Sequence, residues 1–129
     1  CFLGKTYVRI LDDEGKETTR QIADLRRGVR IWTGFNYVAL RMLLKCEVST
    51  AHITTLPNGV QITHTHPVKQ HSKWEYPRDI TGSTTKEIEV DAVYNLLLEP
   101  TTTPWVEIEG VRFITLAHNI TDDSLLSHN

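Results

Sequence analysis

The two ends of the chain carry the side chains with the most distinctive chemistry. Cys1 supplies a thiol, and the last two residues are His128 and Asn129. A cysteine sulfur can attack the carbonyl of the residue before it and form a thioester, a step that is uphill unless the peptide is strained or its oxyanion is held. An asparagine amide can attack its own main-chain carbonyl, assisted by a neighbouring imidazole. We therefore expect peptide-bond cleavage before Cys1 and after Asn129.

A threonine and a histidine in the middle of the chain fit the first of these reactions. Thr63 and His66 are separated by two residues. A hydroxyl and an imidazole at this spacing, near the end of a strand, can converge on the peptide bond before Cys1, where the histidine protonates the departing amine. The pair predicts assistance to N-terminal cleavage.

The six histidines also allow a metal-binding interpretation. On a strand, His64 and His66 would point to the same face, and His71 follows close behind. No third ligand stands at a recognisable zinc spacing, and Glu75 comes nine residues after His66 instead of three or four, as a cupin-like metal barrel would require. A non-catalytic β binding module that uses these three histidines for a metal or ligand remains the alternative.

Composition restricts the class of protein that positions these residues. The 129 residues are enough for one domain with a single core, and we expect a monomer. The hydrophobic fraction of 40% and the charged fraction of 23% exclude disorder and coiled coil. A net charge of -2 with scattered Lys and Arg argues against nucleic-acid or anionic-membrane binding, and no apolar run is long enough to span a bilayer. Two cysteines make no disulfide framework, and a required free thiol favours a reducing cytoplasm.

The elements that must hold these residues are predicted to be strands. The chain contains ten Val, ten Ile and seventeen Thr in short runs between turn signals. Strands are expected over residues 6–11, 29–33 and 38–48, with a turn at 12–15. The clearest hairpin joins residues 52–56 to 60–63, because Asn58 and Gly59 supply the positive-φ turn positions. Within the third of these strands, Cys46 is expected to be a core thiol.

The second half of the chain continues this pattern. Residues 87–99 are typical of one long strand or a bent pair, and residues 105–108 are expected to pair with 111–116 through Glu109 and Gly110. Helical spacing occurs only at residues 19–27, where Ile22 and Leu25 lie three apart and Gly28 would end the helix. We predict an all-β domain with at most one short helix.

Several segments, in this order, resemble the Hint superfamily of inteins, bacterial intein-like domains and hedgehog autoprocessing domains. The resemblance covers the whole chain and is greatest for the Vint-type and bacterial intein-like branch, including domains that lie between ubiquitin-like domains in ciliate polyproteins. The matching segments are CFLGKTYV at 1–8, LRRG at 25–28, ITHTHPV at 62–68, WEYP at 74–77, VYNLLLE at 93–99 and TLAH at 115–118.

This resemblance implies a horseshoe-like Hint fold with pseudo-twofold symmetry, formed by residues 1–129 as a single domain without an endonuclease insertion. By the resemblance, Cys1 is the nucleophile, Thr63 and His66 activate the N-terminal bond, and His128 assists cyclisation of Asn129. His118 would orient the C-terminal carbonyl.

Two departures from the family pattern bear on this assignment. Asn95 stands where inteins often have an aspartate that tunes the nucleophile, so no acid-base contribution is expected there. His118 and Asn119 form a second His-Asn pair, which is an alternative C-terminal junction. We favour Asn129, because a core that ends at Asn119 is short for the family.

The function that the resemblance implies is a single-turnover, self-processing reaction without a cofactor, since tethered reactants need none. Its partners are covalently attached flanking segments, or exteins, ubiquitin-like domains among them. A Cys, Ser or Thr after Asn129 would lead to splicing, whereas without one the thioester would pass to water or to an amine, as in ubiquitin-like conjugation. An inactive Hint domain that serves as a linker remains a further alternative.

Overall fold

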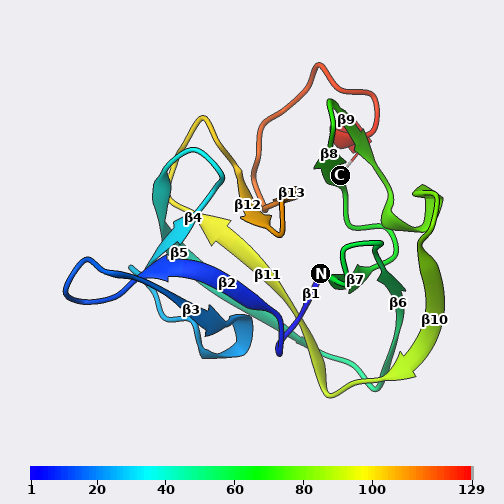
Figure 1. The fold of residues 1–129 in the computed structure, drawn as a ribbon, viewed down its shortest axis with the longest axis horizontal. Helices are drawn as coiled ribbons and strands as arrows, with labels where there is room; N and C mark the ends of the chain where they lie inside the picture. The colour runs from blue at the N-terminus through cyan, green and yellow to red at the C-terminus, as the bar shows by residue number, and fades with distance from the viewer. Residues whose placement is uncertain (129) are drawn as a thin grey trace.

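The computed structural model describes residues 1–128 as two antiparallel sheets (Figure 1). The larger has nine strands in the order β10-β6-β7-β1-β11-β5-β4-β2-β3, and the smaller has four in the order β12-β13-β8-β9. The strands are β1 (Phe2–Leu3), β2 (Tyr7–Leu11), β3 (Glu17–Gln21), β4 (Arg30–Trp32), β5 (Tyr37–Glu47), β6 (Thr50–Thr55), β7 (Gln61–Thr63), β8 (Val68–Gln70), β9 (Lys73–Glu75), β10 (Thr84–Glu89), β11 (Ala92–Leu98), β12 (Trp105–Ile108) and β13 (Val111–Ile114). The all-β prediction is confirmed.

The first strand lies in the middle of the larger sheet, although it has only two residues. Phe2 is opposite Tyr94 of β11 on one side and Ile62 of β7 on the other. Figure 1 shows the N-terminus in the centre of the molecule, where β1 meets β7. Residue 1 is therefore held by strands that are distant from it in the sequence.

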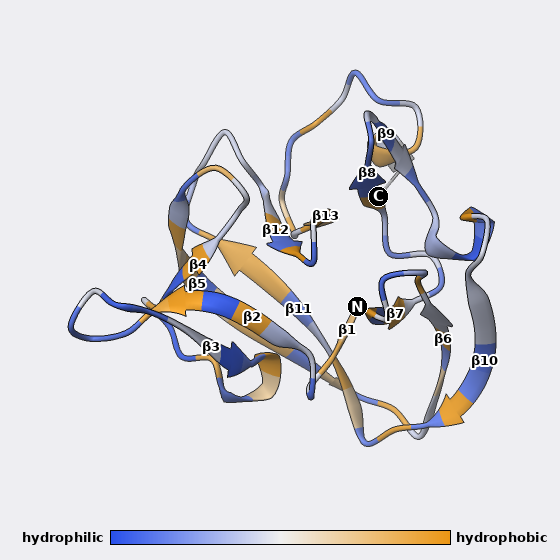
Figure 2. Cartoon of the chain, in the orientation of Figure 1, coloured by the Kyte–Doolittle hydropathy of each residue, from blue (hydrophilic) through white to orange (hydrophobic). Residues whose placement is uncertain are grey.

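A continuous apolar core holds this arrangement together. Phe2, Ile62, Leu96 and Phe113 are all fully buried in one cluster, to which both sheets contribute. Figure 2 shows that β11, which crosses the molecule, is mostly hydrophobic, as expected of a central strand that is covered by other elements. Because Phe2 belongs to this core, its neighbour Cys1 has little freedom of position.

The predicted hairpin at residues 52–63 is confirmed as β6 and β7, but its turn uses only one left-handed residue. Gly59 has φ 91°, whereas Asn58 does not appear among the positive-φ residues. The side chain of Asn58 instead accepts a hydrogen bond from the backbone N–H of Val60 at 3.0 Å. Both residues of the turn between β12 and β13 are left-handed, with φ 51° at Glu109 and 80° at Gly110, as in a tight two-residue hairpin.

The short helix expected within residues 19–27 is present only as a single 3-10 turn. Most of its first turn belongs to β3, which pairs with β2, and only one 3-10 turn follows, η1 (Ile22–Asp24). Hydrogen bonding to β2 favours a strand here, and so do the β-branched side chains of Thr18 and Thr19. Together they outweigh the helical preference indicated by the spacing of two apolar residues. Two more 3-10 turns, η2 (Pro77–Asp79) and η3 (Leu126–His128), occur elsewhere in the described chain.

The segment at 87–99 forms a bent pair, one of the two predicted outcomes. Its first part belongs to β10, which pairs with β6, and its second part forms β11, which pairs with β5 and β1. Cys46 of β5 is exposed, so the prediction of a core thiol is wrong. On β5, the last residues that contact the main core are Leu40 and the partly buried Leu43. The second half of the strand, which includes Cys46, extends past that core.

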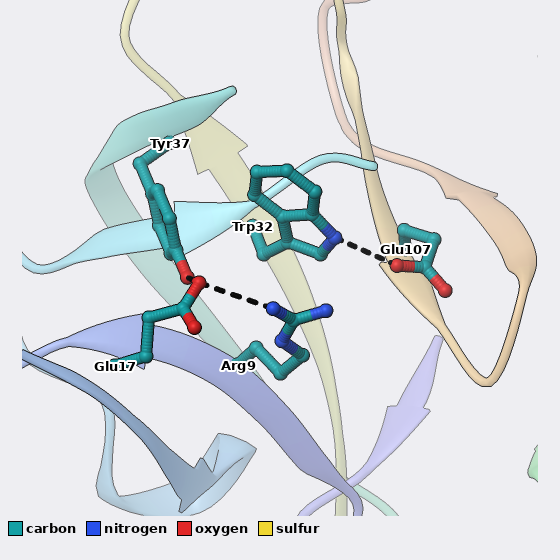
Figure 3. A network of polar contacts seen from close by, with 5 residues as sticks. All are labelled: Arg9, Glu17, Trp32, Tyr37 and Glu107. Atoms are coloured by element: carbon teal, nitrogen blue, oxygen red, sulfur yellow. Dashed lines mark hydrogen bonds and ion pairs between the residues drawn. The ribbon is translucent and has the colours of Figure 1, made fainter. Parts of the chain in front are cut away.

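A network of polar side chains joins the smaller sheet to the larger one (Figure 3). The indole of Trp32 on β4 donates a hydrogen bond to the Glu107 carboxylate on β12 at 2.8 Å. The Arg9 guanidinium lies 5.0 Å from the Trp32 ring centroid and pairs with Glu17, which also accepts a hydrogen bond from the Tyr37 hydroxyl. The network fixes β12, and through it β13, against the larger sheet. Within residues 1–128, no helix is long and apolar enough to cross a membrane.

Candidate active site

A tight turn brings Thr63 and His66 to the same place. Strand β7 ends at Thr63, and the His66 backbone N–H donates a hydrogen bond to the Thr63 carbonyl at 3.1 Å. The two-residue spacing is that of the ends of a β-turn. His64 therefore does not share a strand face with His66. Its ring stacks instead on His52, with centroids 5.2 Å apart.

Both ends of this turn contact the backbone nitrogen of Cys1. That nitrogen lies 2.6 Å from the Thr63 hydroxyl and 2.6 Å from Nδ1 of His66. The Thr63 hydroxyl and backbone N–H also donate hydrogen bonds to the Cys1 carbonyl, each at 3.1 Å. The predicted convergence of Thr63 and His66 on Cys1 is present in the structure.

The ring orientation of His66 is fixed from the opposite side. Nε2 lies 2.8 Å from the carbonyl oxygen of Ile114. A carbonyl only accepts hydrogen bonds, so in the neutral ring Nε2 carries the proton and Nδ1 presents its lone pair to Cys1. The ring is 7% exposed and packs edge-on against Phe2, with centroids 4.8 Å apart. The smaller sheet thus sets the tautomer that the N-terminal site uses.

Burial keeps this site uncharged at neutral pH. It holds the pKa of His66 well below its ordinary value of 6.5, and the nearby Cys1 amino group acts in the same direction, while the Ile114 carbonyl partly opposes them. When Cys1 is the first residue, burial also lowers the pKa of its amino group from 8.0 to about 5. Nitrogen and imidazole therefore form a neutral hydrogen-bonded pair.

The Cys1 thiol has its own partner, which sequence reasoning did not include among the site residues. The side-chain amide of Asn95 donates a hydrogen bond to the Cys1 sulfur at 3.3 Å. An amide cannot take the thiol proton at neutral pH, but its N–H stabilises a thiolate. The family resemblance had marked position 95, and the pairing of Phe2 with Tyr94 places residue 95 beside residue 1.

These groups line a cavity of about 340 Å³. Its wall includes Cys1, Asn95 and the segment 114–118. Thr115 of this segment is 4% exposed, and its hydroxyl has no hydrogen-bond partner within residues 1–128. Sequence reasoning did not single it out, and no sequence signal identifies it, because burial and a missing partner are properties of the fold.

His118 also lines the cavity, in agreement with its predicted place near the site. Its Nδ1 accepts a hydrogen bond from the backbone N–H of Ile120 at 3.0 Å. Its neighbours Ala117 and Asn119 have left-handed backbones, with φ 53° and 58°, which non-glycine residues rarely adopt. Such strain is frequent at functional sites.

The predicted C-terminal pair is only partly described. Asn129 lies outside the described residues, and His128 is described only as the end of η3. The preceding Leu126 is fully buried in a cluster with Trp74 and Ile114. Since the Ile114 carbonyl also orients His66, the C-terminal turn and the N-terminal site are anchored to the same strand.

The three histidines of the metal-binding alternative are not brought together. His66 is buried beside Cys1, His64 stacks on His52, and His71 is exposed in the turn between β8 and β9, with φ 64°. Among residues 1–128, no group of three or more His, Cys, Asp or Glu side chains is placed to hold a metal ion. His64, His66 and His71 therefore do not form one site in the described part of the chain.

Comparisons with known proteins agree with this geometry. The family model Vint, described as a Hint domain, matches residues 1–129. The crystal structure of the gp41-1 intein is similar in fold, with a TM-score of 0.56 at 10% sequence identity, covering 88% of this chain and 96% of that one. A comparison with curated proteins finds no significant match. The expected Hint fold is confirmed, and the chain belongs to the Vint family of Hint domains.

Proposed function

We propose that this domain processes the polypeptide that contains it, beginning with an N-to-S acyl shift at Cys1. One observation carries the proposal. The Cys1 nitrogen lies 2.6 Å from both the Thr63 hydroxyl and His66 Nδ1, while the Cys1 sulfur accepts a hydrogen bond from Asn95. The bond-forming and bond-breaking atoms of an acyl shift thus each have a partner.

In a chain that continues upstream, the Cys1 nitrogen is the amide nitrogen of the scissile bond. The sulfur attacks the preceding carbonyl, the C–S bond forms and the C–N bond breaks. The thiol loses one proton and the leaving nitrogen gains one, so the reaction is balanced. Nδ1 of His66 is unprotonated in the resting site, so it first takes up the proton that the thiol gives up and then passes it to the leaving nitrogen, which it contacts; the hydrogen bond to the Ile114 carbonyl stabilises the ring while it is protonated.

Thr63 holds the nucleophilic residue in place. Its backbone N–H and hydroxyl both donate hydrogen bonds to the Cys1 carbonyl, and the hydroxyl accepts from the Cys1 nitrogen. Cys1 is therefore clamped on the downstream side of the scissile bond. Such fixation gives an intramolecular attack an advantage equivalent to a high effective concentration.

The second cleavage is proposed at Asn129, assisted by His128, and not at the His118-Asn119 pair. Cleavage after Asn119 would detach Leu126, which is fully buried against Trp74 and Ile114. The segment after Asn119 is thus part of the folded domain. His118, which lines the Cys1 cavity, would assist the reaction from within the fold.

The fate of the thioester depends on the flanking segments. With a Cys, Ser or Thr after Asn129, the expected outcome is splicing of the flanks. Without one, the thioester passes to water or to an amine, which would transfer the upstream segment, a ubiquitin-like protein in the expected case, to an acceptor. No cofactor takes part in any of these steps.

A precursor with about five native flanking residues and a reporter protein at each end tests the proposal. Intact mass would be followed after purification under reducing conditions, beside a Cys1→Ala, Asn129→Ala double variant. We expect the wild-type precursor to yield cleaved or ligated reporters and the double variant to stay intact. Equal persistence of both precursors would contradict the proposal and favour an inactive linker.

A second pair of variants tests the role of the turn. His66→Ala should suppress cleavage before Cys1 while leaving cyclisation of Asn129 at least partly active. His64→Ala is the matched control, because His64 lies in the same turn but faces His52. Equal loss of N-terminal cleavage in both variants would mean that the turn, and not the His66 imidazole, is required.

A further inference from the structure

The nitrogen and sulfur of Cys1 are presented together at one cavity. The nitrogen contacts Thr63 and His66, the sulfur contacts Asn95, and both the thiol and the imidazole belong to residues that line the cavity. When Cys1 is the first residue, these two atoms form a 1,2-aminothiol. This group captures acyl chains in a way that a thiol or an amine alone does not, because the amine makes the capture irreversible under mild conditions.

We propose that the domain, once freed of its upstream segment, acylates itself from an external peptide α-thioester and ends with a new amide bond at the Cys1 nitrogen. The proposal rests on the proposed function only for the release of the Cys1 nitrogen. It adds an activity in trans: the product of self-processing is an acceptor for thioesters, and not an inert by-product.

The reaction proceeds in two balanced steps. The Cys1 sulfur attacks the thioester carbonyl, a new C–S bond forms, and the external thiol leaves with the proton that the Cys1 thiol gave up. The Cys1 nitrogen then attacks the same carbonyl through a five-membered ring, the C–N bond forms and the C–S bond breaks. One proton moves from the nitrogen to the sulfur, and no oxidant or reductant is consumed.

His66 is placed to carry that proton. Its Nδ1 lone pair faces the nitrogen at 2.6 Å, because Nε2 is engaged with the Ile114 carbonyl. The nitrogen must also be uncharged to attack, and burial lowers the pKa of the Cys1 amino group to about 5. At pH 6.5 such an amine is almost entirely neutral, whereas one with the ordinary pKa of 8.0 is about 3% neutral.

The cavity has room for the incoming acyl group. Its volume of about 340 Å³ suits one or two residues of a peptide, and Leu116 and Ala117 add apolar surface beside the polar groups. Leu116 is 37% exposed, so this side of the cavity can be reached from solvent. The substrate class is therefore a peptide thioester with a small thiol leaving group.

The chain contains its own control for the test. Cys46 is an exposed free thiol whose backbone nitrogen is already an amide, so an acyl group on its sulfur stays a thioester. Hydroxylamine removes thioesters and leaves amides intact, which separates the two fates. A Cys46→Ser variant then leaves Cys1 as the only thiol.

The experiment uses the folded chain 1–129 with a free Cys1 amine, a model tripeptide α-thioester and the pentapeptide CFLGK as reference. Intact and tandem mass spectrometry would follow the conversion of sulfur-bound acyl groups into hydroxylamine-resistant amide at pH 6.5. We expect amide at Cys1, formed roughly tenfold or more faster than in the pentapeptide, since about 30 times more of the amine is neutral.

Two variants assign the effect to the site. His66→Ala and the isosteric Thr63→Val should each slow the sulfur-to-nitrogen step, so that a hydroxylamine-sensitive adduct accumulates. Circular dichroism would verify that each variant is folded. If His66→Ala does not fold, the result with Thr63→Val alone tests the role of the site. Absence of amide in the wild type, or conversion no faster than in the pentapeptide or in the folded variants, would overturn the proposal. Cleavage of a precursor whose freed domain takes up no acyl group would overturn this inference alone and leave the proposed function standing.

Discussion

Blocking the Cys1 amine should change how the stability of the domain depends on pH. In the free-amine chain, burial lowers the pKa of this group from 8.0 to about 5. Between these values the unfolded state binds more protons than the folded state, so the free energy of unfolding rises with pH. An acetyl group on the same nitrogen removes this titration and leaves the rest of the site in place.

The expected magnitude follows from the two pKa values. From pH 9 down to pH 6.5, the free-amine chain should lose about 2 kcal/mol of stability, and about 4 kcal/mol down to pH 5. His66, whose pKa is also lowered, adds a loss in the same direction below its ordinary value of 6.5. The window from pH 6.5 to 9 therefore isolates the amine.

Urea unfolding followed by tryptophan fluorescence would measure this difference. The free-amine and acetylated chains should diverge below pH 8, with the acetylated chain keeping a flatter profile down to about pH 6.5. Parallel profiles across this window would show that the amine is solvated in the folded state, which would refute the buried contact of the Cys1 nitrogen with His66.

Substitutions at three further positions have defined outcomes. Thr115→Val should raise the free energy of unfolding by about 1 kcal/mol in urea, because it removes a buried hydroxyl without a partner within residues 1–128. Leu126→Ala should lower it by about 2–5 kcal/mol, whereas a dispensable tail after Asn119 would show no change. Asn95→Asp should slow thiol-induced cleavage roughly tenfold in a gel assay, because a carboxylate near the Cys1 sulfur disfavours the thiolate, while Asn95→Ala should slow it less.

The reactive residues of the site were easier to predict from the sequence than the residues that surround them. Cys1, Thr63 and His66 could be predicted because their side chains react in recognisable ways and because a two-residue spacing fits a turn. Asn95 was marked only by the family resemblance, and its contact with the Cys1 sulfur depends on the register between β1 and β11. Thr115 could not be predicted, since its missing partner is a property of the fold.

The differences at residues 19–27 and at Cys46 have a common cause. Residues 19–21 pair with β2 as part of a strand, despite the helical spacing at residues 19–27. The alternation around Cys46 did not reveal that the second half of β5 extends past the core. The strand at residues 19–21 and the exposure of Cys46 both depend on which other element packs beside the segment. Local residue spacing contains no information about that neighbour. The hairpins at 52–63 and 105–114 were predictable because their turn residues act locally.

The most direct test of self-processing is the mass of the upstream fragment that a thiol releases from a precursor. A small thiol should cut the precursor before Cys1 and leave the upstream segment as its thiol ester, which hydroxylamine would convert to a hydroxamate. Release should disappear in Cys1→Ala and fall strongly in His66→Ala. A precursor that stays intact with thiol and with hydroxylamine, or a fragment that ends elsewhere, would contradict the account.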